Sequence, residues 1–341
     1  MNFLPVISRA RSKLRPKLPL LEIAAEVREL EPASSVECKP PLFLPGELDR
    51  VVDFLGGREA QVPRLLTTVR SEGPTLSHRF PQALLADFTV YCGNRFEVYS
   101  PATKRAVLTG SPDEFEEAQL CTTSCAQAYF GHFLRESLPL EVLAHQRGMT
   151  ALTFDRQPWL HEPGYRSLVG LDSVRASHAR VKNLWITDER ALNEGWRARF
   201  QSLRKTLRGK ANPSRETHVY LRRGTLGTAR NLLNEDEIAE RLDSAGFQVI
   251  APETMTAEEV ASSLAGAKTV VCIEGSVQQH AFIAMPEGAA MVSIQPPARF
   301  NSIAKLLSDA ISASFAFVVA DPAAGGFTLD PDRLLRTIDL V

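Results

Sequence analysis

Arginines gather in one short loop in the second half of the chain. Arg222-Arg223-Gly224 directly follows a stretch of β-forming residues, and Arg230 stands a few positions further on. A guanidinium group binds phosphate oxygens through two parallel N–H bonds, which suits an anionic ligand. A solvated basic loop would have the same composition, so both interpretations stay open at this point.

A glycine turn, Glu274-Gly275-Ser276, follows an apolar stretch and precedes a helical pattern. Glycine permits a tight strand-to-helix turn, Ser276 can cap the helix, and free N–H groups at a helix N-terminus can bind phosphate. Glu274 could accept hydrogen bonds from ribose or sugar hydroxyls, with His280 about one turn further along. The turn matches neither G-x-G-x-x-G nor G-x-x-x-x-G-K-[ST], so neither a dinucleotide fingerprint nor a P-loop is present.

Polar residues also open the helix expected after the arginine loop. Asn234 stands at its N-cap position, and Glu237 three residues later completes a predicted capping box. Capping explains most of this segment, because acidic residues in a first helical turn complement the helix dipole. The functional alternative gives Asn234 or Glu235 a contact with a hydroxyl group of a ligand.

The first half of the chain contains one candidate acid–base pair, His132 and Glu136. Residues four apart share one face of a helix, and a carboxylate beside an imidazole fixes its tautomer and raises its basicity. His132 could then remove a proton from a hydroxyl group. The structural alternative, a histidine in a helix–helix contact, is the commoner role of such a pair.

The elements that must position these residues are clearest beyond residue 212. We expect strands at 218–221, 247–250, 269–273, 290–294 and 315–319, and helices at 235–245, 256–265, 276–285 and 301–312. Thr256 and Glu259 form a second capping box. Such alternation predicts a parallel sheet with helices on both faces, and ligands of these sheets bind at the carboxyl ends of the strands.

The first half is less regular. We expect a hairpin around Gly93-Asn94, a mostly helical stretch over 114–147, strands at 149–154 and 183–187, and an amphipathic basic helix over 188–210. The first forty residues form a basic extension with a short helix near 20–30. Its run from Arg9 to Lys17 could contact an anionic membrane surface, but we favour a solvated extension.

Length and composition narrow the function. A chain of 341 residues is long enough for two domains, and 44% hydrophobic residues suit a globular protein. The formal net charge of -1 argues against general binding of nucleic acid. No apolar stretch is long enough to span a bilayer, and no signal peptide is recognisable. The five cysteines lack the spacing of a zinc site and are expected to be reduced thiols.

Three segments, taken together and in this order, resemble glycosyltransferase family 61: YFGHFLRESLPLEVL, VYLRRGTLGTARNLLNEDEIAERLDSAGFQVI and AKTVVCIEGSVQQHAFIAMPEGAAMVSI. The resemblance covers roughly residues 125–321, and its last two segments are the distinctive ones. It places the family's histidine on His132 and the acid that follows it on Glu136. The family's strand-end arginine falls on Arg222 or Arg223, and its Arg–Asn–Glu series falls on Arg230, Asn234 and Glu235.

The sequence departs from the family at the glycine turn. Many members have His-Gly-Ala where this chain has Glu274-Gly275-Ser276, and His280 replaces a later asparagine. We therefore assign Glu274 to donor binding rather than to the role of base.

The resemblance implies an α/β protein of GT-B-like architecture, with two Rossmann-like domains and a parallel sheet in the C-terminal domain. The expected ranges are a basic extension at 1–40, an acceptor-side domain at 41–187 and a nucleotide-sugar-binding domain at 188–341. Residues Gly275, Ser276 and His280 are assigned, with Glu274 and the arginines, to donor binding.

The activity implied is that of an inverting transferase that needs no metal or other cofactor. Its donor would be a nucleotide-sugar, a UDP-sugar above all, and its acceptor a glycan or lipid-linked glycan of bacterial surface polysaccharide synthesis. Such an enzyme is expected to be cytoplasmic and to work at the inner face of the cell membrane. The alternatives are a non-catalytic glycan- or nucleotide-binding protein and another Rossmann-like nucleotide-using enzyme.

Overall fold

The computed structural model describes residues 19–100, 111–213, 217–224 and 230–341. The predicted basic run from Arg9 to Lys17 lies outside the described residues. The chain divides into two compact units, which we call unit 1 and unit 2. Unit 1 comprises Met1–Ser34, Glu72–Trp159 and Gly170–Leu203, and unit 2 comprises Ser35–Ser71, Leu160–Val169 and Arg204–Val341. The units therefore alternate along the chain, whereas the predicted ranges 1–40, 41–187 and 188–341 are consecutive.

Unit 1 is built around a mixed sheet in the order β6-β5-β4-β10-β7-β8-β9, with β1 paired to β4. Strands β4, β5 and β6 form an antiparallel meander, whereas β10, β7, β8 and β9 are parallel. The bounds are β1 Glu26–Glu31, β4 Thr75–Ala86, β5 Thr89–Cys92, β6 Arg95–Val98, β7 Asp113–Leu120, β8 Thr150–Phe154, β9 Val174–Ala176 and β10 His178–Asp188. The hairpin predicted at Gly93-Asn94 is confirmed as the β5–β6 connection, and the strands predicted at 149–154 and 183–187 are confirmed as β8 and β10.

The helices of unit 1 come after β7 or β10 in the sequence, except for the first, which precedes β1. They are η1 Leu20–Ile23, α3 Ser124–Ala128, α4 Phe130–His132, the π-helical η3 Phe133–Ser137, α5 Leu138–Gln146 and the start of α7 Glu194–Lys210. Two predictions were wrong. Residues 114–120 form strand β7 rather than helix, because Ala118 and Leu120 are buried between β10 and β8, and this pairing overrides the helix propensity of a Glu-rich segment. Residues 20–30 form a short 3-10 turn followed by β1.

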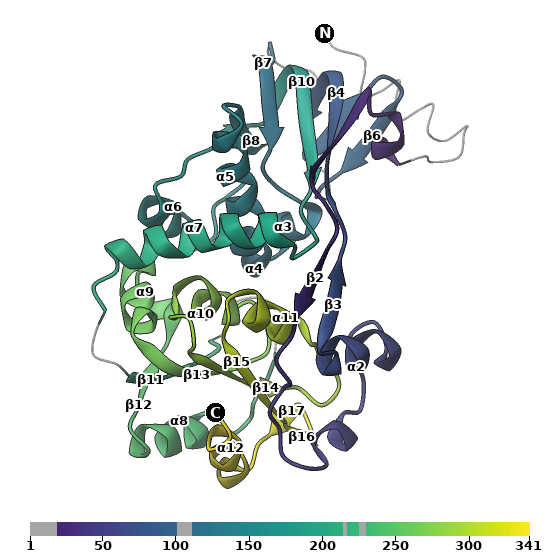
Figure 1. Cartoon of the computed structure of the whole chain (residues 1–341). Coiled ribbons are helices and arrows are strands. Elements are labelled where there is room, and N and C mark those ends of the chain that lie inside the picture. The colour runs from purple at the N-terminus through teal and green to yellow at the C-terminus, as the bar shows by residue number, and fades with distance from the viewer. Residues whose placement is uncertain (1–18, 101–110, 214–216, 225–229) are drawn as a thin grey trace. The chain divides into compact units, whose positions relative to one another are not determined.

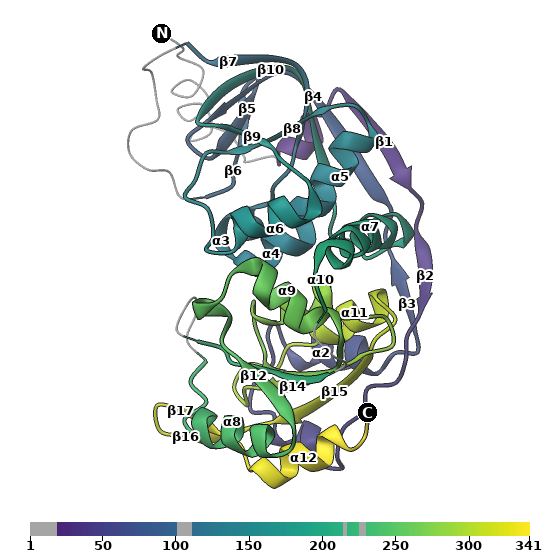
Figure 2. The ribbon, with the colours of Figure 1, turned by 90° about the vertical axis from the view of Figure 1, so that its left-hand side faces the viewer.

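Unit 2 contains the predicted parallel sheet, with strands in the order β12-β11-β13-β14-β15. Helices α8 and α12 cover one face, and α9, α10 and α11 cover the other (Figure 1 and Figure 2). Strand β14 is buried along its whole length, as expected for a parallel strand covered on both faces. The strands are β11 Thr217–Leu221, β12 Phe247–Ile250, β13 Ala267–Ile273, β14 Ala290–Gln295 and β15 Ser314–Val319, and the helices are α8 Glu235–Ser244, α9 Ala257–Ala265, α10 Gln278–Ala284, α11 Ile303–Ala310 and α12 Pro331–Ile338.

The remaining elements of unit 2 lie outside its five-stranded sheet. The backbone of Leu42 pairs with β15, donating to the carbonyl of Phe315 and accepting from the N–H of Phe317, so this edge of the sheet is covered. The elements are β2 Ser34–Glu37, η2 Glu47–Arg50, α2 Arg58–Leu66, β3 Val69–Glu72, α6 Glu162–Val169, η4 Pro252–Thr254, β16 Asp321–Ala323 and β17 Gly326–Thr328. None of the helices in the described ranges is both long and apolar enough to cross a bilayer.

Candidate functional site

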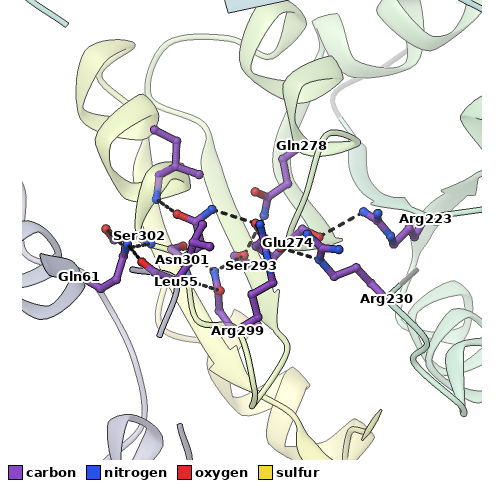
Figure 3. Close-up of polar contacts among 12 residues, drawn as sticks. Leu55, Gln61, Arg223, Arg230, Glu274, Gln278, Ser293, Arg299, Asn301 and Ser302 are labelled. Atoms are coloured by element: carbon purple, nitrogen blue, oxygen red, sulfur yellow. Dashed lines mark hydrogen bonds and ion pairs between the residues drawn. The ribbon is translucent and has the colours of Figure 1, made fainter. Parts of the chain in front are cut away.

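Three loops meet at the carboxyl edge of the parallel sheet in unit 2. Glu274 follows β13 directly, Arg223 lies in the loop after β11, and Arg299 lies in the loop after β14. Parallel strands end at the same edge, so residues that are distant in the sequence come together there (Figure 3). This is the edge at which open α/β sheets bind their ligands.

The carboxylate of Glu274, which is 2% exposed, lies at the centre of the cluster. It accepts hydrogen bonds from Nε of Arg230 at 2.8 Å, from Nη1 of Arg299 at 2.9 and 3.0 Å, and from Nδ2 of Asn301 at 2.9 Å. Its backbone carbonyl accepts from Nη1 of Arg223 at 3.2 Å. Three guanidinium groups therefore converge on Glu274, and guanidinium groups suit an anionic ligand. We call Arg223, Arg230, Glu274, Arg299 and Asn301 the arginine cluster.

Two neighbours fix the position of Arg223. The carboxylate of Glu235 accepts from the backbone N–H of Arg223 at 3.0 Å and from the hydroxyl of Tyr220 at 3.1 Å. Gly275 has a φ of +135°, and a Cβ there would stand 2.3 Å from Nη1 of Arg223. Burial, followed by the charge of Arg230, lowers the pKa of the Arg223 guanidinium. Glu235 thus holds the backbone of Arg223, and the lack of a side chain at Gly275 leaves room for the guanidinium.

Some predicted binding residues are placed elsewhere. The guanidinium of Arg222 pairs with the carboxylate of Asp236 at 2.5 Å. Asn234 exchanges hydrogen bonds with the backbone of Leu329, and its Nδ2 donates to Glu237. Its side chain makes no capping bond, so the predicted capping box at Asn234 was wrong, because the amide instead holds the chain before α12. The capping box of Thr256 and Glu259 is confirmed.

The start of α10 also differs from the prediction. The helix begins at Gln278 with Val277 as its N-cap, whereas the sequence predicted a start at Ser276. The N–H of Gln278 donates to the carbonyl of Gly275, and the N–H of Gln279 donates to that of Ser276. Ser276 therefore lies in the turn before the helix and makes no capping bond to it.

His280 lies on α10 and is 3% exposed. The hydroxyl of Tyr165 on α6 lies 2.7 Å from Nδ1 of His280, and the His161 ring packs against it edge-on with centroids 4.9 Å apart. Nε2 of His161 lies 3.0 Å from the carbonyls of Pro252 and Met255. Burial, with a smaller effect of His161, lowers the pKa of His280 from 6.5 to about 3, so its imidazole stays neutral. These contacts join α6 to α10, and they join the residue before α6 to the η4 segment that precedes α9.

A second cluster, in unit 1, contains the predicted acid–base pair. Nδ1 of His132 lies 2.5 Å from Oε1 of Glu136, and Oγ1 of Thr123 lies 2.5 Å from Oε2. Because a carboxylate only accepts hydrogen bonds, Nδ1 carries a proton, and in the neutral imidazole Nε2 then carries the lone pair. Nη2 of Arg135 lies 2.9 Å from Nε2 and 3.1 Å from Nδ1. We call these four residues the histidine cluster.

The charge of Glu136 is maintained by its neighbours. Burial alone would raise the pKa of Glu136, but the hydrogen bond and charge of His132, the charge of Arg135 and the hydroxyl of Thr123 together lower it. Glu136 is therefore a carboxylate at neutral pH and can stabilise a positive charge on the imidazole. The side chain of His132 is 25% exposed, so its ring is reachable from solvent.

The elements around the histidine cluster explain its geometry. Thr123 follows the carboxyl end of β7 and caps α3, accepting from the N–H of Ala126 at 3.0 Å. His132 ends α4, and Glu136 lies in the π-helical turn η3, an irregularity that is frequent at functional sites. Nε1 of Trp196 on α7 donates to the carbonyl of Arg135 at 2.9 Å.

Sequence reasoning missed Arg299 and Asn301 in the arginine cluster, and Thr123 and Arg135 in the histidine cluster. The first pair follows β14, and the rule that ligands bind at the carboxyl ends of strands would have found them. Thr123 follows β7, a strand that the sequence did not reveal. Among the residues that the structure describes, no group of His, Cys, Asp or Glu side chains is arranged to hold a metal ion.

Comparison with known proteins adds the activity class. The family model of Glycosyltransferase 61 matches residues 130–292, which include His132 of the histidine cluster and the loops after β11 and β13. This match supports family 61 and indicates a glycosyltransferase. No curated protein matches the sequence. Among solved structures, the flavodiiron protein from Giardia intestinalis is similar with a TM-score of 0.25 and 9% identity. The match covers 81% of this chain and 64% of the flavodiiron protein, so this chain spans less than two thirds of that protein's length.

Proposed function

We propose that the protein transfers a sugar from a nucleotide-sugar donor to an acceptor hydroxyl, with inversion at the anomeric carbon and without an obligatory metal. The observation that carries the proposal is the convergence of three arginines at the carboxyl edge of a parallel sheet. Arg299, whose side chain is 37% exposed, can turn from Glu274 to a ligand oxygen. The departing nucleoside diphosphate gains negative charge, and fixed guanidinium groups stabilise that charge as it develops.

The histidine cluster supplies the base in this proposal. Nε2 of His132 takes the proton of the acceptor hydroxyl while its oxygen attacks the anomeric carbon, and the bond from that carbon to the diphosphate oxygen breaks. The imidazolium that forms is stabilised by Glu136 through Nδ1. Attack on the side opposite the leaving group inverts the configuration. Arg135 lies 2.9 Å from Nε2, so the acceptor hydroxyl takes the place of this contact.

Other parts of the proposal rest on the resemblance to the family. They are a GT-B architecture, a UDP-sugar as the donor, and a glycan or lipid-linked acceptor. They also include a place in bacterial surface polysaccharide synthesis at the cytoplasmic face of the membrane. For the donor-binding residues, the cluster supports Arg223, Arg230, Glu274 and Gly275 most directly. In this proposal Glu235 positions Arg223, and Arg223 contacts the donor.

Nucleotide binding tests the arginine cluster directly. We expect UDP to raise the melting temperature equally in EDTA and in Mg²⁺, because a ligand at about a hundred times its Kd adds roughly 2.7 kcal/mol to stability. Replacing Arg299 by Ala should weaken UDP binding about tenfold or more, because a hydrogen bond to a charged group contributes about 1.5–3 kcal/mol. Arg241→Ala is the matched control, since the Arg241 side chain on α8 is 52% exposed and pairs with Asp332 on α12.

Three outcomes would count against the proposal. UDP binding that is unchanged in Arg299→Ala would exclude the arginine cluster as the phosphate site. Binding that requires Mg²⁺ would contradict metal independence. A product that keeps the anomeric configuration of the donor, seen in its proton NMR coupling, would contradict inversion.

A further inference from the structure

Tyr129 lies beside the histidine cluster and is the most exposed aromatic side chain in the described part of the chain, at 50%. Its ring centroid lies 5.8 Å from that of His132, with an angle of 42° between the ring planes. The large aromatic residues of this chain are otherwise buried or half-buried where the structure describes them. The exposed phenol ring beside the candidate base therefore offers an apolar face with a polar rim to a ligand.

The backbone holds Tyr129 in a fixed position. The residue is extended, with φ −140° and ψ 128°, and separates α3 from α4. Its N–H donates to the carbonyl of Cys125 at 2.8 Å, and its own carbonyl accepts from the N–H groups of His132 and Phe133 at 3.1 and 3.3 Å. The ring is thus attached to the same turn that carries the imidazole.

A side-chain contact ties the other end of α3 to the base as well. Thr123 caps α3 through Ala126 and donates to the carboxylate of Glu136. Tyr129 and His132 are therefore positioned by one connected set of contacts. Because the two ring centroids are 5.8 Å apart, a ligand on the Tyr129 ring would lie close to the imidazole of His132.

We propose that Tyr129 is the stacking platform for the sugar ring of the acceptor, and that the acceptor is therefore a pyranoside rather than an acyclic alcohol. This inference rests on the function proposed above. A pyranose ring is similar in width to a phenol ring and presents C–H groups on its faces and hydroxyls at its rim. A pyranose stacked on Tyr129 directs a rim hydroxyl toward His132, whereas an acyclic alcohol offers no flat apolar face to the ring.

Saturation-transfer NMR on the full chain tests the proposal with simple probes. Methyl β-D-glucopyranoside and methyl β-D-galactopyranoside are compared with sorbitol, which has hydroxyls but no ring. We expect saturation on the ring C–H protons of at least one pyranoside, a loss of that signal in Tyr129→Ala, and its retention in Tyr129→Phe. The affinity for that pyranoside should fall on the order of tenfold in the alanine variant. Val98→Ala, at an exposed apolar position of the same unit, should change nothing.

The outcomes separate this proposal from the proposed function. An unchanged signal in Tyr129→Ala, an equal signal from sorbitol, or no signal from either pyranoside would overturn the role of Tyr129. UDP binding, measured in the same samples, should be equal in the wild type and in all variants. If UDP failed to bind the wild type while the pyranoside signal still depended on Tyr129, the donor site would be wrong and the stacking platform would stand.

Discussion

Acidification should destabilise the chain through His280. Its pKa is lowered to about 3 in the folded protein by burial, against an ordinary value of 6.5. Below the ordinary value the unfolded chain binds a proton that the folded chain does not bind. Stability is therefore fully present above about pH 6.5 and is lost as the pH falls toward the folded pKa. At about pH 5, with 1.36 kcal/mol for each pKa unit, the loss from this one group is about 2 kcal/mol.

The test compares His280→Asn with the wild type by urea unfolding at about pH 7.5 and at about pH 5. Asparagine keeps a polar atom near the position of Nδ1, where the Tyr165 hydroxyl bonds. The constant cost of the smaller side chain cancels, because only the change in stability with pH is compared. The variant should lose about 2 kcal/mol less than the wild type over this interval. His145→Asn, at an exposed histidine, is the control.

An equal loss in His280→Asn and wild type would refute the reasoning. It would mean that the buried imidazole is protonated in the folded state or that the site is open to water. The same variants also decide the role of the residue in donor binding. UDP binding that is unchanged at about pH 7.5 in His280→Asn would assign the residue to the α6–α10 contact.

Three further substitutions have expected outcomes. Gly275→Ala should weaken UDP binding about tenfold in calorimetry, because the added methyl group meets the guanidinium of Arg223. It should also cost about 1–3 kcal/mol of stability, because a φ of +135° is strained for alanine. Unchanged UDP binding would exclude a contact between Arg223 and the ligand. Glu136→Gln should lower kcat by about 10²-fold or more in a transfer assay, with UDP affinity unchanged, because His132 loses the carboxylate on Nδ1. Arg204→Met should lower the free energy of unfolding in urea by about 3 kcal/mol, because the buried guanidinium bonds the last carbonyls of α10.

The second half of the fold could be predicted because its signals are local. The strands at 247–250 and 290–295 are short apolar runs, and the capping box of Thr256 and Glu259 depends on residues three apart. The hairpin at Gly93-Asn94 was predictable for the same reason. In such segments propensity, capping and burial all favour one structure.

The errors lie where distant contacts decide the structure. Strand β7 contains Glu114, Glu116 and Glu117, which favour helix, yet it pairs with β10 across more than sixty residues of sequence. The pairing of Leu42 with β15 joins residues about 270 positions apart, and no local pattern announces it. Asn234 had the right sequence for a capping box, but its amide bonds Leu329 instead.

The types of residue in the site could be predicted from the sequence, but the side chains with which they pair could not. The sequence identified Arg223, Arg230 and Glu274 as candidates, and the structure brings these three together. It also identified Arg222, whose pairing with Asp236 on the first turn of α8 could not be foreseen from the loop sequence. A side chain's type indicates what it can bind, whereas its direction depends on which neighbour competes for it.

The arginine cluster gives a physical reason for the glutamate in the glycine turn. Guanidinium groups that converge on one sheet edge repel one another, and burial of Arg230, whose side chain is 9% exposed, makes that repulsion costly. Glu274 accepts hydrogen bonds from Arg230, Arg299 and Asn301, so the donors are already fixed in direction before any anion arrives. Uncharged glutamine at this position would relieve less of the repulsion. The carboxylate therefore offsets the repulsion among the arginines, while their three guanidinium groups leave the site attractive to a diphosphate.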